Sequence, residues 1–384
     1  MARLAPILLL VSSAAGPGAA VPASLPFPTV VERIPVVLLV DLSAGQTLYA
    51  RDADRRFLPA SMTKAMSALV AFELIASGKL LEDQRFVVDA DTSRQWSGKG
   101  TSLFLRAGAE VTVRDLLLGL TTVSANDAAV VLAQGALGST QAWIAQMNDQ
   151  ARHLGMNDSH FGTPNGWPDG GATYVSARDL IRLAEALINR HPALYRTYFG
   201  HPAMVWNGRS FANHDPFAGV VPGADGIKTG HTFEAGFNFL GAVERDQRRL
   251  IVVVAGAQNP DLRAKTARDL VEWGYAAWHS RILVGEGTRL GSARVQGGDA
   301  RHVTLTAAQR VTVAVPQGTN PAISARIVYR GPLRAPIAKG AQVAGLEVTI
   351  AGRPPHILPL VAADAVGIAG PLDRLVNGLA GLVS

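Results

Sequence analysis

Residues 59–78 read PASMTKAMSALVAFELIASG, a stretch that predicts a helix buried along most of its length but carrying Lys64 near its start. The chain has only six lysines against thirty arginines, so lysine is not its usual cation. Residues three apart on a helix share a face, which puts the Lys64 amine within reach of the Ser61 hydroxyl. A lysine desolvated by apolar neighbours loses affinity for its own proton and can serve as the base for a serine nucleophile.

This S-x-x-K pattern has an ordinary alternative, in which Ser61 caps the helix and Lys64 extends to water. A second pattern lies in TTVSANDAAVVLA, where Ser124 and Asn126 stand two apart at the entry to a predicted helix. Ser124 could relay a proton between Lys64 and a leaving amine, and Asn126 could hold a substrate amide. The alternative here is a capping box formed by Ser124 and Asp127.

A third pattern, DGIKTGHT, is predicted to lie on a strand. Lys228 offers a point charge for a substrate carboxylate, and Thr229 and Thr232 offer hydroxyls. Gly230 would leave room for the substrate backbone against the strand edge. The ordinary alternative is that this segment is an exposed strand and Lys228 is a surface lysine.

The same strand supplies backbone groups. The N–H of His231, paired with the N–H of Ser61, would form an oxyanion hole. The order S-x-x-K, S-x-N, K-T-G is the motif set of β-lactamases and penicillin-binding proteins, and it is far more specific than any one of its parts.

The chain resembles the low-molecular-mass penicillin-binding proteins, serine-type D-alanyl-D-alanine carboxypeptidases of the S11 type. The resemblance covers nearly the whole chain and is carried by PASMTK, SANDAA, GMNDSHFGTPNG, SARDL, DGIKTGHT, EAGFN, LRAPIAKGAQVAGLEV and PLVA. It implies that Ser61 is the acyl-ester nucleophile, Lys64 the proton acceptor, Ser124 the second active-site serine and Lys228 a substrate-binding residue. It implies no cofactor.

Two positions depart from the family pattern. Ala125 stands where many relatives have glycine, and neither side chain needs to enter the site. His214, in ANHDP, stands where relatives can have an arginine that assists carboxylate binding. The contribution of His214 is open, because a histidine can be neutral at pH 7.

The resemblance implies an α/β fold of the β-lactamase/transpeptidase type over residues 28–282, with an antiparallel sheet, helices on both faces and a helical subdomain. Residues 34–54 predict a hairpin, helical patterns dominate from 61 to about 190, and strands return in DGIKTGHT, FNFLGAVE and RRLIVVVAGA. The segment DLRAKTARDLVEWGYAAWHS predicts a helix. Residues 285–363 predict a small all-β sandwich domain.

Both ends of the chain suggest export and a membrane surface. Residues 1–23 have the layout of a signal peptide, with Arg3, an apolar run and small residues. Residues 370–384 predict an amphipathic helix that could lie on a membrane as an anchor. We therefore expect a periplasmic protein, and the C-terminal segment predicts peripheral attachment to the outer face of the inner membrane.

The composition narrows the class of protein. With 48% hydrophobic and 17% charged residues the chain is globular. Without cysteine it has no disulfide and no thiolate metal site, and its histidines lack metal-ligand spacing. A net charge of +6 suits binding to an anionic surface. The chain has no Lys/Arg-rich run with interleaved aromatic residues, so nothing in it predicts nucleic-acid binding.

The expected reaction is removal of the terminal D-alanine from peptidoglycan pentapeptide stems, with β-lactams as covalent inhibitors. One alternative is a class A-like β-lactamase, for which Glu185 and Asn189 offer an incomplete pattern. Another is a penicillin-sensing or wall-binding module without hydrolytic activity.

Overall fold

The computed structural model describes residues 26–353 and 355–371. The described chain forms two compact units: residues 26–42 with 47–275, and residues 43–46 with 276–371. The first unit carries the S-x-x-K, S-x-N and K-T-G motifs. The predicted signal peptide and nearly all of the predicted C-terminal helix lie outside the described residues, and none of the described helices is long and apolar enough to cross a membrane.

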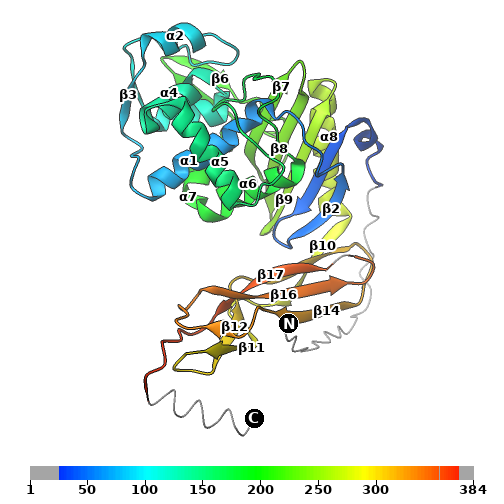
Figure 1. Cartoon of the computed structure of the whole chain (residues 1–384). Coiled ribbons are helices and arrows are strands. Elements are labelled where there is room, and N and C mark those ends of the chain that lie inside the picture. The colour runs from blue at the N-terminus through cyan, green and yellow to red at the C-terminus, as the bar shows by residue number, and fades with distance from the viewer. Residues whose placement is uncertain (1–25, 354, 372–384) are drawn as a thin grey trace. The chain divides into compact units, whose positions relative to one another are not determined.

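A five-stranded sheet forms the centre of the first unit, in the order β2-β1-β9-β8-β7 (Figure 1). The bounds of its strands are β1 Val36–Asp41, β2 Gln46–Arg51, β7 Ala224–Thr232, β8 Gly236–Arg245 and β9 Arg248–Ala257. β1 pairs antiparallel with β9, so strands from the two ends of the unit meet as the sequence predicts. β7 pairs with β8 alone and is therefore an edge strand, open to an added chain.

Helices cover both faces of this sheet, as predicted (Figure 1). Helices α1 (Thr63–Ala76) and α6 (Ala177–Arg190) lie on one face, and α8 (Pro260–Ala276) lies on the other. Gly274 of α8 lets this helix approach closely, because a Cβ there would lie 2.8 Å from a methyl of Leu39. The predicted helix through Ser280 is too long: α8 ends at Ala276, and Trp278 begins strand β10, since its residues pair with β13.

The helical subdomain surrounds α1 with elements that follow it in the chain. These are α2 Ala90–Trp96, α3 Val113–Leu118, a π turn at Gly119–Val123, α4 Asn126–Leu137, α5 Thr140–His153 and α7 Pro192–Tyr198. The helical path of α3 does not end at Gly119, because the π turn continues it to Val123. Two small hairpins were not predicted, β3 Arg85–Val87 with β4 Glu110–Thr112 and β5 Ala203–Trp206 with β6 Arg209–Ala212.

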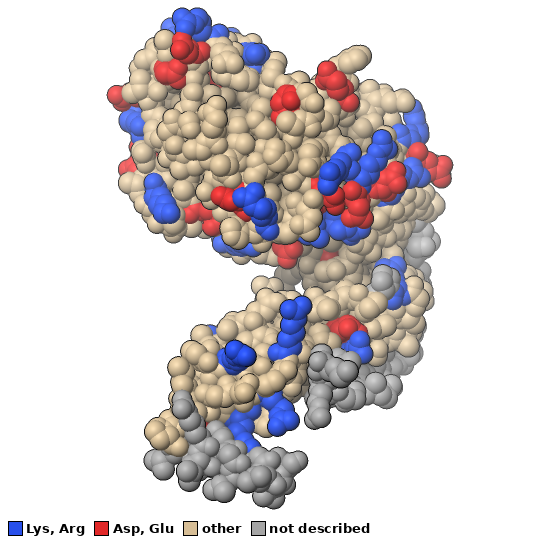
Figure 2. Space-filling view, in the orientation of Figure 1, with Lys and Arg blue, Asp and Glu red and all other residues tan. Residues whose placement is uncertain are grey.

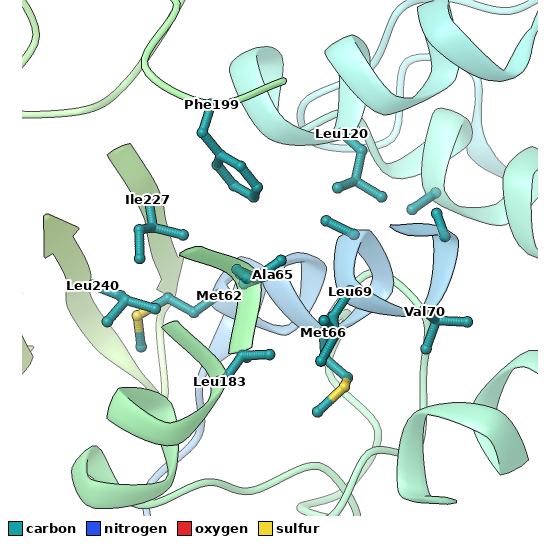
Figure 3. Close-up of a cluster of buried hydrophobic side chains, with 14 of the residues drawn as sticks. Met62, Ala65, Met66, Leu69, Val70, Leu120, Leu183, Phe199, Ile227 and Leu240 are labelled. Atoms are coloured by element: carbon teal, nitrogen blue, oxygen red, sulfur yellow. The ribbon is translucent and has the colours of Figure 1, made fainter. Parts of the chain in front are cut away.

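The core explains why α1 is buried. Its residues 63–72 are all buried. In Figure 3 the side chains of Met62, Ala65 and Met66 lie among groups from the sheet, from α6 and from the helical subdomain, including Leu240 and Leu183. When a helix has apolar contacts on every side, a charged side chain on it cannot reach water.

The second unit is all-β, as predicted. It contains a six-stranded sheet in the order β14-β16-β17-β12-β11-β15 and a two-stranded sheet, β10-β13. The bounds are β10 Trp278–Val284, β11 Arg289–Gln296, β12 His302–Ala307, β13 Val311–Pro316, β14 Ile323–Val328, β15 Leu333–Arg334, β16 Gln342–Ile350 and β17 His356–Ala362. Buried Val313, Leu346 and Leu360 belong to its separate hydrophobic core.

Candidate active site

Ser61 lies in a short 3-10 turn, Ala60–Met62, that leads directly into α1. The Met62 N–H donates to the Pro59 carbonyl at 3.2 Å and closes this turn. No side chain caps the start of α1, so the alternative in which Ser61 is a helix cap is wrong. Ala60 has a φ of 50°, a left-handed conformation that costs a non-glycine residue free energy and is typical of functional sites.

Two glycines allow neighbouring segments to pack against this turn. A Cβ on Gly230 of β7 would lie 2.3 Å from the Pro59 carbonyl oxygen. A Cβ on Gly166 would lie 1.9 Å from the Ala60 carbonyl oxygen. The absent side chain of Gly230 makes room for the turn that carries Ser61. That Gly230 also leaves room for the substrate backbone stays a prediction.

The Lys64 side chain is completely buried, and its amine has three polar neighbours. Nζ lies 2.8 Å from Ser61 Oγ, 2.8 Å from Asn126 Oδ1 and 2.7 Å from the carbonyl oxygen of Asn165. The two carbonyl-type oxygens can only accept hydrogen bonds, whereas the serine hydroxyl can also donate one. A neutral amine can donate to both carbonyls and turn its lone pair toward Ser61.

The surroundings of Lys64 favour this neutral form. Burial lowers its pKa well below the usual value, and the charge of Lys228 lowers it further, while Asp127 acts in the opposite direction. The alternative in which Lys64 extends to water is excluded by its burial. Sequence reasoning missed the carbonyl of Asn165, although this residue lies in GMNDSHFGTPNG, one of the segments that carry the family resemblance.

Asn126 begins α4 and fixes Lys64 in place. Its Oδ1 accepts from Lys64, and its Nδ2 donates to the Lys99 carbonyl at 2.9 Å. Ser124, two residues earlier, is buried with a φ of 67° at the end of the π turn, and its carbonyl accepts from the Thr101 hydroxyl at 2.7 Å. The structure thus brings Ser124 and Asn126 to the same pocket as Ser61.

The proposed capping box of Ser124 and Asp127 is wrong. Ala125 occupies the N-cap position of α4, and no side chain caps it. The buried Asp127 carboxylate instead accepts hydrogen bonds from the Ser102 hydroxyl and from the backbone N–H groups of Leu103 and Leu105. This carboxylate therefore fixes the loop that continues from Gly100 and Thr101 at the pocket.

Lys228 on β7 is buried, with 4% of its surface exposed, so the surface-lysine alternative is wrong. Its Nζ donates to the Thr229 carbonyl at 3.0 Å. Burial lowers its pKa to about 7; the charge of Asp215 raises it and that of Arg263 lowers it. Lys228 lies beneath the surface of the pocket. Its charge therefore acts on an anion in the cavity mainly through long-range electrostatic attraction and not through direct contact.

The motif residues meet in one cavity of about 580 Å³. The predicted site residues that line it are Ser61, Ser124, Asn126, Thr229, Gly230, His231 and Thr232. Trp167, Phe233 and Arg263 also line it and were not predicted. Arg263 lies on α8, where the sequence shows an ordinary amphipathic helix and no motif, so nothing in the pattern marks it.

His214 lines the same cavity. Burial lowers its pKa below the ordinary value, and the charges of Lys228 and Arg263 lower it further. The lowered pKa favours the neutral form of the ring at pH 7. The next residue, Asp215, has a partly buried carboxyl, and desolvation raises its pKa to about 6.

The edge strand β7 forms one wall of the cavity. Its residues Thr229 to Thr232 line it, and the His231 ring stacks on Phe237 of β8 with centroids 3.9 Å apart. Among the described residues, no cluster of three or more histidines or carboxylates could hold a metal ion. The groups that the cavity offers are a serine hydroxyl, a buried amine beside it and an open strand edge.

Comparison with known proteins agrees with this geometry. Residues 34–259 match the peptidase S11 family, described as D-alanyl-D-alanine carboxypeptidase. Residues 278–367 match the C-terminal domain of penicillin-binding protein 5. The chain is 35% identical over 346 residues to D-alanyl-D-alanine carboxypeptidase DacD of Salmonella typhimurium, a match that covers 88% of this chain and 87% of the relative.

Solved structures are similar in fold as well. Penicillin-binding protein 5 from Haemophilus influenzae superposes with a TM-score of 0.74 at 28% identity, covering 87% of this chain and 98% of the other. Penicillin-binding protein D2 from Listeria monocytogenes, solved in an ampicillin-bound form, covers 63% of this chain and 97% of its own. Its TM-score is 0.57 and its identity is 29%.

Proposed function

The chain belongs to the D-alanyl-D-alanine carboxypeptidase family, and we propose that it performs this family's reaction through an acyl-enzyme on Ser61 with Lys64 as the base. The observation that carries this assignment is the 2.8 Å contact between Lys64 Nζ and Ser61 Oγ. The same amine is fixed by two acceptor oxygens and has a lowered pKa. A base needs this lowered pKa to be neutral near pH 7.

In acylation, Lys64 takes the proton of Ser61 as Oγ attacks the carbonyl carbon of the penultimate D-alanine. The negative charge that develops on the carbonyl oxygen is stabilised by the backbone N–H groups of Ser61 and His231. The C–N bond then breaks. The proton passes from Lys64 through the Ser124 hydroxyl to the leaving amine, and free D-alanine departs.

In deacylation, water attacks the ester carbonyl and Lys64 accepts a proton from it. The ester C–O bond breaks, Ser61 regains its proton, and the shortened peptide leaves. Thr229 and Thr232 provide hydroxyls and Lys228 a positive field for the substrate's C-terminal carboxylate. Asn126, which positions Lys64, keeps one Nδ2 hydrogen for a substrate amide.

We propose the pentapeptide stem of peptidoglycan as the substrate and β-lactams as covalent inhibitors. The open edge of β7 suits an extended peptide that adds as a further strand. A β-lactam presents a strained amide and a carboxylate in a similar arrangement. The ampicillin-bound relative supports this part of the proposal.

The test is release of D-alanine from a diacetyl-Lys-D-Ala-D-Ala peptide. The wild-type chain should release it, and Ser61→Ala should abolish both release and covalent labelling by penicillin. Lys64→Arg should be nearly as damaging, because a guanidinium cannot act as a base at pH 7. Ser77→Ala, at the exposed end of α1, is the matched control and should be silent. Labelling that survives at another serine would refute the assignment.

A class A-like β-lactamase is the weaker candidate. Its deacylation needs a glutamate that activates water in the site. Glu185 is exposed on α6 and does not line the cavity. A sensing module without hydrolytic activity would be recognised by penicillin labelling of Ser61 without any release of D-alanine.

We further propose that the protein is exported to the periplasm and held on the outer face of the inner membrane. Residues 276–371 contain ten Lys and Arg against four Asp and Glu, which gives this unit the whole net charge of +6. Figure 2 shows basic side chains spread over its visible face. A basic surface next to an apolar C-terminal segment suits an anionic membrane.

Truncation after residue 370 tests this localisation. The truncated enzyme should leave the membrane fraction and keep its activity, because residues 372–384 are far in sequence from every site residue. A full-length protein found wholly in the soluble periplasmic fraction would contradict membrane attachment.

A further inference from the structure

Phe233 is an exposed aromatic side chain on the wall of the active-site cavity. It directly follows the last residue of β7, and 98% of its surface is exposed, the largest fraction among the large apolar side chains of the described residues. The Ala235 N–H donates to the Thr232 hydroxyl at 3.1 Å and closes the turn that carries Phe233. A single exposed apolar residue on a distant surface needs no explanation. One that lines a cavity can contact a ligand there.

A second cavity, of about 310 Å³, adjoins the first on the side of this turn. The two cavities share lining residues, among them Trp167, Thr232 and Glu234, and are therefore neighbours. The second cavity also reaches Ala60, which directly precedes Ser61. A substrate longer than two residues therefore has room beyond Ser61 on the side of Thr232.

Trp167 lines both cavities and is held in place by its neighbours. Its backbone N–H donates to Asn165 Oδ1 at 3.0 Å. Its ring packs edge-to-face on Trp96 with centroids 5.6 Å apart, and Lys99 Nζ lies 4.8 Å from the centroids of both rings. A ring that is already fixed loses little conformational entropy when a ligand packs against it.

The direction of the substrate along β7 decides which part of it meets these two aromatic rings. In the proposed reaction Lys228, in the middle of the strand, attracts the C-terminal carboxylate, and the His231 N–H stabilises the oxygen of the scissile carbonyl. The chain upstream of the scissile bond therefore runs past Thr232 toward Phe233. An extended chain advances about 3.3 Å per residue, so the residue that precedes D-Ala-D-Ala lies beside this turn.

We propose that Phe233 and Trp167 bind the side chain of the residue that precedes D-Ala-D-Ala, and that the enzyme therefore prefers a long aliphatic side chain at this position over a short one. The inference rests on the proposed function and assigns a subsite for a third substrate residue. Contact with two aromatic rings suits the methylene groups of such a side chain. The phenylacetyl group of benzylpenicillin is attached at the equivalent position and should use the same contact.

The experiment compares diacetyl-Lys-D-Ala-D-Ala with acetyl-Gly-D-Ala-D-Ala on the full-length chain. Wild type should have the higher kcat/KM for the lysine peptide. Phe233→Ser should lower that kcat/KM by about three- to tenfold, the loss expected when an apolar contact is removed from a partly exposed site. The same variant should change kcat/KM for the glycine peptide by less than about twofold, because glycine has no side chain to bind.

Two variants serve as controls. Phe233→Leu keeps an apolar side chain and should keep most of the preference for the lysine peptide. Val205→Ser removes an exposed apolar side chain that lines neither cavity and should leave the ratio of the two kcat/KM values unchanged. An equal loss on both peptides, or an unchanged ratio in Phe233→Ser, would overturn the inference.

Acylation gives a second readout that needs no hydrolysis. It compares benzylpenicillin with the penicillin nucleus that carries a free amine in place of the phenylacetyl group. Phe233→Ser should slow acylation by benzylpenicillin and spare the nucleus. If wild type releases no D-alanine from either peptide but shows this pattern, the proposed function fails and the role of Phe233 stands. If Phe233→Ser is acylated by both compounds as wild type is, the role of Phe233 fails.

Discussion

The Lys64 amine and the Asn126 side chain form a fixed pair, with Nζ 2.8 Å from Oδ1. Because Nδ2 of Asn126 is held by the Lys99 carbonyl, the amide cannot turn without losing a hydrogen bond. Asn126 therefore always presents an oxygen to Lys64. This neutral acceptor orients the amine without adding a negative charge that would keep it protonated.

Asn126→Asp should place a carboxylate on Lys64 and raise its pKa. The acid limb of the kcat/KM profile should then move by at least about one pH unit to higher pH, with activity at pH 7 reduced by about tenfold or more and recovered at higher pH. The exposed Asn157→Asp is the control for one added charge. A uniform loss at every pH would contradict the proposed coupling.

Gly230→Ala tests the packing of β7 against the turn that carries Ser61. The new methyl would lie 2.3 Å from the Pro59 oxygen, so the turn or the strand must move. We expect kcat/KM to fall by about 100-fold, since a displacement near 1 Å is enough for such a loss. Gly285→Ala, whose closest contact is a side chain 3.3 Å away, should be silent. Normal activity in Gly230→Ala would show that the turn adapts freely.

Much of the site could be predicted from sequence because its chemistry is local. Ser61 and Lys64 share one helical turn, and the K-T-G residues share one strand, so short-range geometry fixes their relation. The hairpin at 34–54 and the strands β7 to β9 follow from alternation and apolar runs. The partners of Lys64 could be predicted less well, because Asn165 contributes a backbone carbonyl, which every residue type has.

Other features depend on contacts between distant segments. Arg263 reaches the cavity only because α8 packs across the sheet and begins near β7. The packing of Gly230 depends on the position of Pro59, 171 residues earlier in the chain. The end of α8 at Ala276 is set by the pairing of β10 with β13, which overrides the helical tendency of the preceding residues.

Asp127→Ala should destabilise the first unit. The carboxylate accepts from Ser102 Oγ and from two backbone N–H groups at 3.0 Å, and its loss leaves these donors buried without partners. We expect the free energy of unfolding to fall by about 3 kcal/mol or more, since each orphaned buried donor costs about 1–3 kcal/mol. Urea denaturation measures the change.

The matched control for Asp127→Ala is Asp149→Ala, which removes an exposed carboxylate paired with Arg152 on α5. Its effect should stay below about 1 kcal/mol, as is usual for surface ion pairs. Equal stability of the two variants would mean that water replaces the Asp127 contacts. The kcat/KM of Asp127→Ala should also fall, because the Asp127 carboxylate holds the loop that leads to Gly100 and Thr101 at the cavity.

The two buried lysines should give kcat/KM a characteristic dependence on pH. Lys64 works as a neutral base, so kcat/KM should rise with pH through its lowered pKa. Lys228 works as a cation, and because its pKa is about 7 its charge is present below that pH and lost above it. The kcat/KM for a carboxylate substrate should therefore fall as the pH rises through about 7, which makes the profile bell-shaped.

Lys228→Ala should change both limbs of the pH profile. The variant has no Lys228 charge to lose near pH 7, so its overall kcat/KM should be lower and the descending limb should flatten. Because Lys228 depresses the pKa of Lys64, its removal should also move the ascending limb to higher pH. Asp215, whose pKa is about 6, and His214 titrate nearby, so Asp215→Asn is measured alongside to separate their contribution. A Lys228→Ala profile that coincides in shape with wild type would show that neither limb depends on this lysine.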